Sequence, residues 1–350
     1  MKNLWNDRDA GTCGDDLLAL RVYSSRLIGK NSDLVLHGGG NTSVKAPFID
    51  FFGERHEAIY IKGSGWDLAT IEAAGFAPVR LDALIKLSQF KTLSDTDMVS
   101  AQRVAMLDQN APNPSVEAIL HAIIPFRFVD HTHADAVVTL TNTPNGEERI
   151  RTLYGNRVLV VPYVMPGFEL ARKIADLTRK TDWSMLEGMV LMNHGIFTFA
   201  DEASDSYDRM IRLVSEAEGI LKKRPSAGAD NKEVPLLQVA KLRSAVSVAA
   251  GKAMLARFDG SASHFEFASR PDVDSVACRG PLTPDHVIRT KRLPMIVEDD
   301  NPSPVDRYAQ DYQTYFKKFD DGLLTQLDPA PRWAVWRNRG TLTFGSSDRD

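Results

Sequence analysis

Histidines at the ends of two apolar segments constrain this chain more than any other feature. Residues 128–133 read as a strand, in which alternation would place His131 and His133 on the same face. A second apolar run, residues 189–192, leads to His194 beside a glycine. Either motif alone is also compatible with a turn or a hydrogen-bonded core histidine. Together they predict a site for zinc or a similar divalent metal, provided that the two strands end side by side.

The composition is that of an ordinary globular protein. The chain has 350 residues, of which 43% are hydrophobic and 25% are charged, and its net charge of −4 gives no reason to expect nucleic acid as a partner. No span is apolar enough to cross a bilayer, and the N-terminus lacks the apolar segment of a signal peptide. The two cysteines, Cys13 and Cys278, fit a reducing compartment. We therefore expect a cytoplasmic protein without a membrane partner.

Helical and strand patterns alternate along the chain, which indicates an α/β fold. We expect a first helix that begins after Asp15 or Asp16 and stops at Gly29, and a later one with Ser115 as its N-cap and Glu117 in its first turn. A long amphipathic helix should follow residue 201. Strands are expected at residues 49–52, 58–61, 128–133 and 157–162. Residues 224–228 read as a boundary between a catalytic domain, 1–225, and a C-terminal α/β extension, 226–350.

Two glycine-rich loops, residues 37–43 and 62–65, let backbone N–H groups approach an anion closely. Asn41, Ser43, Lys62 and Ser64 add side-chain donors, so a phosphorylated substrate is plausible, although a run of glycines is more often only a turn. Neither loop has a dinucleotide or P-loop fingerprint, and the chain has no Gly-x-Ser-x-Gly elbow. Nicotinamide-dependent, kinase and serine-hydrolase functions therefore lack their motifs.

The order of these motifs resembles the class II aldolase and adducin family over about residues 15–222. A further segment, Pro284 to Lys291, is similar to one in the aldolase half of bifunctional rhamnulose-phosphate aldolase and short-chain dehydrogenase proteins, which extends the resemblance over nearly the whole chain. The motifs that carry it are Gly40-Asn41-Thr42-Ser43, Lys62-Gly63-Ser64-Gly65, Ser115-x-Glu117-x3-His121, His131-Thr132-His133, Pro162-Tyr163 and Asn193-His194-Gly195.

The resemblance implies a three-layer α/β/α fold with a mainly antiparallel central sheet, in a homo-oligomer such as a tetramer. His131, His133 and His194 would bind Zn²⁺, or Mn²⁺ or Co²⁺, and Glu117 would be the catalytic acid and base. Tyr163 would donate a proton, in some relatives in a neighbouring subunit's site. Asn41, Ser64, Gly65 and Ser115 match the family's phosphate-binding positions, whereas Val116 replaces a small hydroxyl residue common in the family.

The implied reaction is the cleavage of a ketose 1-phosphate, such as rhamnulose 1-phosphate, to dihydroxyacetone phosphate and an aldehyde through an enediolate. Glutamate at position 117 favours aldolase chemistry over the family's epimerases, which have aspartate there. Other family reactions, decarboxylation and dehydration, stay open, as does a non-catalytic adducin-like interaction module. Retention of the histidines and Glu117 argues against the last of these.

Residues 338–344 echo residues 193–199, with Arg339 in place of His194. We expect the C-terminal region to contain a strand and turn similar to those around His194, without the metal.

Overall fold

The computed structural model describes residues 1–221, 235–298, 303–322 and 324–348. It divides into two compact units: unit 1 comprises Met1–Lys222 with Thr283–Asp285, and unit 2 comprises Lys223–Leu282 with His286–Asp350. The boundary that we expect at residues 224–228 lies outside the described residues. No helix in the described part of the chain is long and apolar enough to span a membrane.

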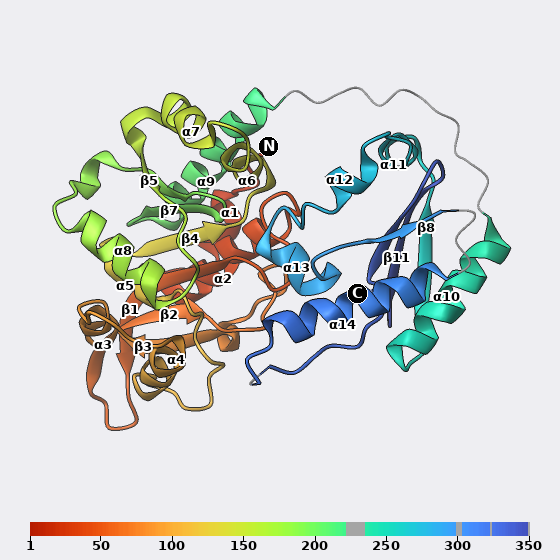
Figure 1. Ribbon diagram of the computed structural model, residues 1–350. Coiled ribbons are helices and arrows are strands. Elements are labelled where there is room, and N and C mark those ends of the chain that lie inside the picture. Colours follow the sequence, from red (N-terminus) through yellow and green to blue (C-terminus); the bar gives the residue numbers. More distant parts are fainter. Residues whose placement is uncertain (222–234, 299–302, 323, 349–350) are drawn as a thin grey trace. The chain divides into compact units, whose positions relative to one another are not determined.

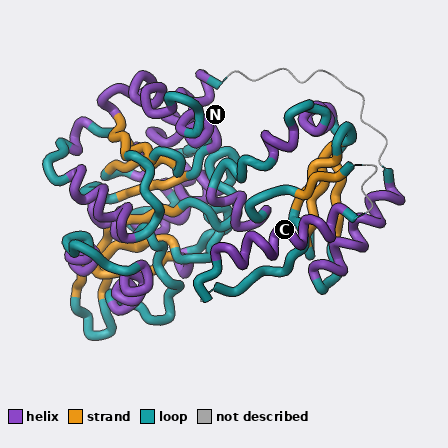
Figure 2. Tube along the Cα trace, in the orientation of Figure 1, coloured by secondary structure: helices purple, strands orange, loops and turns teal. Residues whose placement is uncertain are grey.

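Unit 1 is built on a mixed sheet that is almost entirely antiparallel (Figures 1 and 2). Within the described residues it has seven strands in the order β3-β2-β1-β4-β7-β6-β5, and its parallel pair is β5 with β6. The strands are β1 (Asn41–Ile49), β2 (Arg55–Lys62), β3 (Phe76–Arg80), β4 (Phe128–Thr132), β5 (Val158–Val161), β6 (Gly188–Leu191) and β7 (Gly195–Ala200).

Helices cover both faces of this sheet. In β5, Val158 and Val160 pack into one hydrophobic core while Leu159 and Val161 face the other, as expected for a strand buried on both sides. The first core contains residues of α2 (Leu17–Gly29), α6 (Asp135–Thr141), α7 (Gly146–Tyr154) and α9 (Ala203–Ile220). The second contains residues of α3 (Leu81–Leu87), α4 (Asp95–Val104), α5 (Ala118–Ile123) and α8 (Phe168–Thr178). The predicted three-layer α/β fold with a mainly antiparallel sheet is therefore confirmed.

The shorter helices of unit 1 lie in the connections. They are α1 (Asp7–Gly11), η1 (Ala73–Gly75), η2 (Gly155–Arg157) and η3 (Trp183–Met185).

The prediction of a strand at residues 49–52 is wrong for residues 50–52, which form the tip of the β1–β2 hairpin, whereas Ile49 is the last residue of β1. The Asp50 carboxylate accepts hydrogen bonds from the backbone N–H groups of Phe52 and Glu54, each at 2.9 Å, and Gly53 has φ +81°. Phe51 and Phe52 are 98% and 85% exposed. Turn chemistry overrides the apolar pattern here, and the strand lies earlier in the chain, where we expected a loop at residues 41–43.

The second correction concerns the helix near Glu117, which begins at Ala118 instead of at Val116. Ser115 is not its N-cap, because the backbone N–H of Ser115 is held by the Lys62 carbonyl at 3.1 Å and residues 115–118 form a turn. Glu117 itself is the capping residue. By contrast, Asp16 caps α2 as expected, through hydrogen bonds from the N–H groups of Leu18 and Ala19.

Unit 2 is a smaller α/β unit with its own core. Among the described residues its sheet has four strands in the order β8-β11-β10-β9. The elements are α10 (Leu236–Ala250), β8 (Leu255–Asp259), α11 (Ala262–Ala268), α12 (Val273–Ala277), α13 (Pro284–Thr290), β9 (Met295–Val297), α14 (Pro304–Phe319), β10 (Trp333–Trp336) and β11 (Gly340–Gly345). The first two residues of α13, Pro284 and Asp285, belong to unit 1.

The sheet of unit 2 repeats the part of the unit 1 sheet that carries the histidines. Strands β8, β11, β10 and β9 pair in the same directions as β4, β7, β6 and β5: two antiparallel pairs followed by a parallel one. The order along the chain also agrees, since helices separate β8 from β9 and β9 from β10, as they separate β4 from β5 and β5 from β6. The sheet of unit 2 therefore has the topology of the β4-β7-β6-β5 part of the unit 1 sheet.

Local details confirm the predicted echo between the two units. Asn193 and Asn338 have φ values of 58° and 57° in the turns of equivalent hairpins. A side chain at the glycine that follows would collide with a backbone carbonyl of the neighbouring strand: Thr132 O at 2.3 Å from a Cβ at position 195, and Asp259 O at 2.1 Å from one at position 340. Arg339 stands where His194 stands in unit 1, so this hairpin in unit 2 lacks the equivalent imidazole.

Candidate active site

The topology of the sheet brings distant segments of unit 1 to one edge. Antiparallel neighbours place the end of one strand beside the start of the next, so Lys62 at the end of β2, Asn41 at the start of β1, and His131 near the end of β4 lie at the same edge. The turn between β6 and β7, which holds His194, lies there too. The two histidine motifs therefore lie side by side, as the predicted metal site requires.

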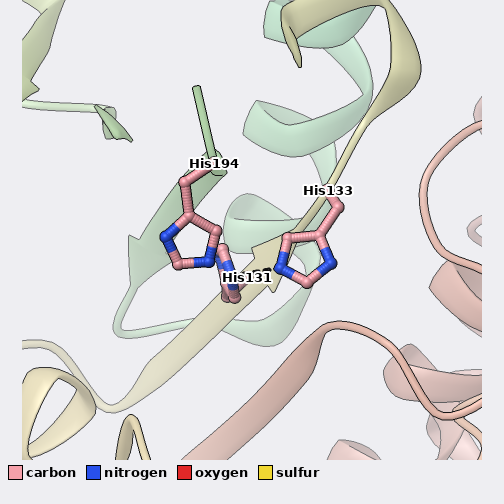
Figure 3. A group of neighbouring side chains, drawn as sticks. All are labelled: His131, His133 and His194. Atoms are coloured by element: carbon pink, nitrogen blue, oxygen red, sulfur yellow. Dashed lines mark hydrogen bonds between the residues drawn. The ribbon is translucent and has the colours of Figure 1, made fainter. Parts of the chain in front are cut away.

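His131, His133 and His194 form a buried cluster. A potential ligand atom of each lies within 4.8 Å of those of the other two, and the Nε2 atoms of His131 and His133 are 3.1 Å apart. Figure 3 shows the three rings turned toward one another, with His131 on its strand and His194 at the start of another. Burial lowers the pKa of His131 and of His194, so both are held in the neutral form that binds metal.

Hydrogen bonds on the far side of the rings select the tautomers. The Nδ1 of His131 donates to the carbonyl of Ile196 at 3.1 Å, and the Nδ1 of His133 donates to the Asp285 carboxylate at 2.6 Å. With Nδ1 as the donor, Nε2 is the nitrogen left to bind a metal, and the lone pairs of the two Nε2 atoms face and repel each other. A shared cation resolves this repulsion, and in a tetrahedral site with metal–nitrogen bonds of about 2.0–2.1 Å, neighbouring nitrogens lie about 3.3 Å apart. The residues therefore fit a divalent metal such as zinc.

The Glu117 carboxylate faces this cluster. Its Oε2 lies 3.4 Å from the Nε2 of His131, and its Oε1 lies 3.5 Å from the Nε2 of His194. Oε2 accepts a hydrogen bond from the Asn41 amide at 2.7 Å. Oε1 is buried, and no hydrogen-bond donor within the described residues reaches it. The carboxylate is therefore anchored by one oxygen and has the other available for proton transfer beside the histidines.

His121 supports Glu117 through Asn41. Because the Asn41 Nδ2 donates to Glu117, its Oδ1 accepts a hydrogen bond from the Nε2 of His121. The Nδ1 of His121 then accepts from the Ser43 hydroxyl at 2.8 Å. Burial holds the pKa of His121 well below its usual value, so the ring is neutral, as this chain of bonds requires. Ser43 is fully buried, and its hydroxyl is bonded to His121.

The remaining polar residues expected at the site lie on two adjoining loops. The Ser64 N–H donates to the Asn113 carbonyl at 2.8 Å, and the Ser115 hydroxyl accepts from Asn41 at 3.2 Å. Ser64 and Gly65 are exposed, and Gly65 has φ +86°, which favours glycine. Lys62 is buried, donates to the Gly38 carbonyl at 2.8 Å, and has its pKa lowered to about 8 by burial.

Tyr163 is not brought into this cluster. It follows β5, 53% of its side chain is exposed, and its hydroxyl lies 3.8 Å from the sulfur of Met165. Because β5 runs parallel to β6, Tyr163 does lie at the same edge of the sheet as His194.

Two features of the site are missing from the sequence-based expectations. Asp285 holds His133, and a fully buried ion pair, with atoms 2.6 Å apart, joins Arg21 of α2 to Asp130, the residue before His131 on β4. The motif at residues 284–291 contains Asp285 and was a signal for it, but the motif does not indicate a partner 152 residues away in the sequence. For Arg21, a basic residue within an apolar helical face was the available signal.

Comparison with known proteins agrees with this geometry. Residues 20–221 match the model of the class II aldolase and adducin N-terminal domain, and residues 234–350 match that of the class II aldolase second domain. A curated relative from Bacillus subtilis, the uncharacterized oxidoreductase YuxG, is 31% identical over 99% of this chain. The chain spans about half of that relative's length, 53%.

Among solved structures, the N-terminal class II aldolase domain of a conserved protein from Thermoplasma acidophilum is 40% identical. The match covers 63% of this chain and 100% of that domain, with a TM-score of 0.58. Fold, domain models and sequence identity therefore agree, and the chain belongs to the class II aldolase and adducin family.

Proposed function

We propose that this chain is a metal-dependent aldolase that cleaves a ketose 1-phosphate, such as rhamnulose 1-phosphate, to dihydroxyacetone phosphate and an aldehyde. The observation that carries the proposal is the convergence of three imidazoles, those of His131, His133 and His194, with the free Oε1 of Glu117. Such a site combines the ligands for a divalent cation with a carboxylate placed for proton transfer. A non-catalytic interaction module would need neither.

Each group of the site has a role in this reaction. His131, His133 and His194 would hold Zn²⁺, or Mn²⁺ or Co²⁺, which when bound would act as a Lewis acid toward the ketose carbonyl and stabilise the enediolate charge. Glu117 delivers a proton to C3 of the substrate as the C3–C4 bond breaks, and removes it in the condensation direction. Asn41 holds the carboxylate in position through its 2.7 Å bond.

Cleavage also requires a base for the proton of the C4 hydroxyl, which becomes the aldehyde oxygen. We assign this step to Tyr163 of a second copy of the chain in a homo-oligomer. The exposure of Tyr163 and its place at the active edge of the sheet support this assignment, because its hydroxyl is free of the cluster in its own chain. The loops with Ser64, Gly65 and Ser115 would bind the phosphate, and Lys62, whose Nζ donates to the Gly38 carbonyl, directly precedes the first of them.

The relative named as an oxidoreductase suggests a wider context. Since this chain covers about half of that relative, we propose that it corresponds to the aldolase part of a two-part protein of the bifunctional type. The aldehyde that it releases would then be a substrate for a dehydrogenase.

The test separates proton transfer from bond cleavage. Release of dihydroxyacetone phosphate from rhamnulose 1-phosphate and other ketose 1-phosphates is followed with a coupled NADH assay, and exchange of a C3 proton of dihydroxyacetone phosphate into D₂O is followed by NMR. We expect Glu117→Gln to lower both rates by about 10²- to 10⁴-fold while the protein still binds metal. Absence of both reactions in the metal-loaded wild type would refute aldolase function.

Metal content needs a matched control, because Asp50, Glu54 and His56 form a second, more exposed group of potential ligands. We expect His131→Ala to lose bound metal and His56→Ala to keep it. The other family reactions are distinguished by their products: an epimer without release of dihydroxyacetone phosphate, carbon dioxide, or a dehydrated sugar acid.

A further inference from the structure

We propose that Asp285 is a positioning residue for the metal ligand His133, supplied from beyond the catalytic domain's own stretch of sequence. The matching N-terminal domain ends at residue 221, and Asp285 falls in the stretch that matches the second domain, 234–350. By its contacts, however, the segment Thr283–Asp285 belongs to unit 1. The proposal rests on the metal site of the proposed function but not on the identity of the sugar.

The first support is that both oxygens of this carboxylate are used. Asp285 is 3% exposed. Its Oδ1 accepts the 2.6 Å bond from the Nδ1 of His133, and its Oδ2 accepts a 2.8 Å bond from the backbone N–H of Leu36. A carboxylate on the far nitrogen of a ligand histidine sets the tautomer, holds the ring plane and makes the ligating nitrogen a better donor. The Nε2 of His133 is thereby directed at that of His131.

The second support is a glycine whose missing side chain makes room for this carboxylate. A Cβ at Gly39 would lie 1.9 Å from the Oδ1 of Asp285, whereas the nearest atom to a Cβ at Gly38 is 3.9 Å away. The N–H of Gly39 donates to the Leu36 carbonyl at 2.9 Å, so the turn that binds Oδ2 also forms the contact surface for Oδ1. The glycine-rich loop at residues 37–40 thus houses Asp285, a role separate from any contact with phosphate.

The stretch that matches the second domain supplies Asp285 to the site. The site's polar contacts are completed by a residue that lies 152 positions after His133 in the chain, so metal affinity depends on a segment outside residues 20–221. Asparagine cannot replace Asp285 fully, because its amide nitrogen cannot accept a hydrogen bond and one of the two donors would lose its partner.

The experiment measures cobalt binding to the full-length chain. Co²⁺ is titrated by its visible absorption, and the Zn²⁺ affinity is obtained by competition with a chelator. We expect Asp285→Asn and Gly39→Ala each to raise the dissociation constant by about 10- to 100-fold, as is typical when the outer partner of a metal ligand is lost. Gly38→Ala and Asp95→Asn are the controls. Asp95 also accepts a backbone N–H, that of Phe168 at 2.9 Å, beside a glycine.

A second readout does not involve the metal. In metal-free protein labelled with ¹⁵N-histidine, the strongly hydrogen-bonded Nδ1 proton of His133 should give a downfield resonance that moves in Asp285→Asn and Gly39→Ala and stays in the controls. Wild-type protein that takes up no Co²⁺ would overturn the metal site and this inference together. Wild-type and Asp285→Asn proteins that bind Co²⁺ equally tightly, with an unchanged His133 resonance, would overturn this inference alone.

Discussion

Replacing Arg21 by methionine should destabilise unit 1 strongly, although we propose no catalytic role for Arg21. Its guanidinium lies 2.6 Å from the Asp130 carboxylate, and the two side chains are 0% and 1% exposed. Asp130 precedes His131, the proposed metal ligand, on β4 and accepts a further hydrogen bond from the Ser206 hydroxyl at 2.5 Å. Without Arg21, the buried carboxylate keeps the Ser206 hydroxyl as its one side-chain partner among the described residues, a change that typically costs about 3–5 kcal/mol.

The Coulomb attraction between Arg21 and Asp130 is similar in size to this cost. Two unit charges whose centres are about 4 Å apart attract by about 4 kcal/mol at an effective dielectric constant of 20, which agrees with the cost expected from breaking a buried pair. Arg179 and Asp176 form the matched control. Their separation is 2.7 Å, but their side chains are 73% and 51% exposed, so Arg179→Met should cost less than about 1 kcal/mol.

Urea unfolding, followed by circular dichroism at fixed protein concentration, measures both costs. A double variant, Arg21→Met with Asp130→Leu, removes both charges, and we expect it to be more stable than Arg21→Met alone because no unpaired charge remains buried. Equal and small costs for Arg21→Met and Arg179→Met would refute the assignment of a buried, energetically coupled pair.

Three further predictions concern packing, pH and metal. Gly29→Ala should lower the free energy of unfolding by at least about 1–3 kcal/mol, because a Cβ at position 29 would lie 2.1 Å from the backbone nitrogen of Ala69. Gly11→Ala is the control, since a Cβ at position 11 meets nothing within 4 Å. Equal unfolding midpoints for the two variants would contradict the prediction. Burial lowers the pKa of Lys62 from 10.5 to about 8, so between these two pH values the unfolded chain binds more protons than the folded one. The free energy of unfolding of the wild type, relative to that of Lys62→Met, should therefore rise by up to about 3 kcal/mol between pH 8 and 10.5. Parallel pH profiles of the two proteins would contradict the lowered pKa. A chelator should lower the melting temperature of wild-type protein by roughly 5–10 °C, since metal at about a hundred times its dissociation constant stabilises by about 2.7 kcal/mol, and should leave His131→Ala unchanged.

Local sequence pattern was sufficient to predict structure wherever a single local interaction dominates. The alternation in residues 128–133 predicted the shared face of His131 and His133, and the Asp16 cap predicted the start of α2, because side-chain periodicity and capping act over a few residues. The same reasoning failed at Phe51 and Phe52, where the Asp50 side chain and a positive φ at Gly53 form a turn from an apolar segment. Competing local interactions of similar strength cannot be ranked from pattern alone.

The prediction that Ser115 is a helix N-cap failed for a different reason. The spacing of Ser115 and Glu117 is that of a helix start, but the Ser115 N–H is bound by Lys62 and the Glu117 carboxylate by Asn41. Both partners come from other strands of the sheet. Tertiary contacts therefore set where α5 begins, and in doing so direct Glu117 toward the histidines.

The sequence by itself determined the kinds of chemical group in the site, the family resemblance and the α/β class, because these depend on residue types and their order. Only the tertiary structure decided that Asn41 and His121 hold Glu117, that Ser43 is buried beneath them, and that Asp285 holds His133. Those contacts join residues 76 to 152 positions apart. Hydrogen bonds of this kind are specified by the pairing of strands and the closure of loops in the folded chain, and no local pattern encodes them.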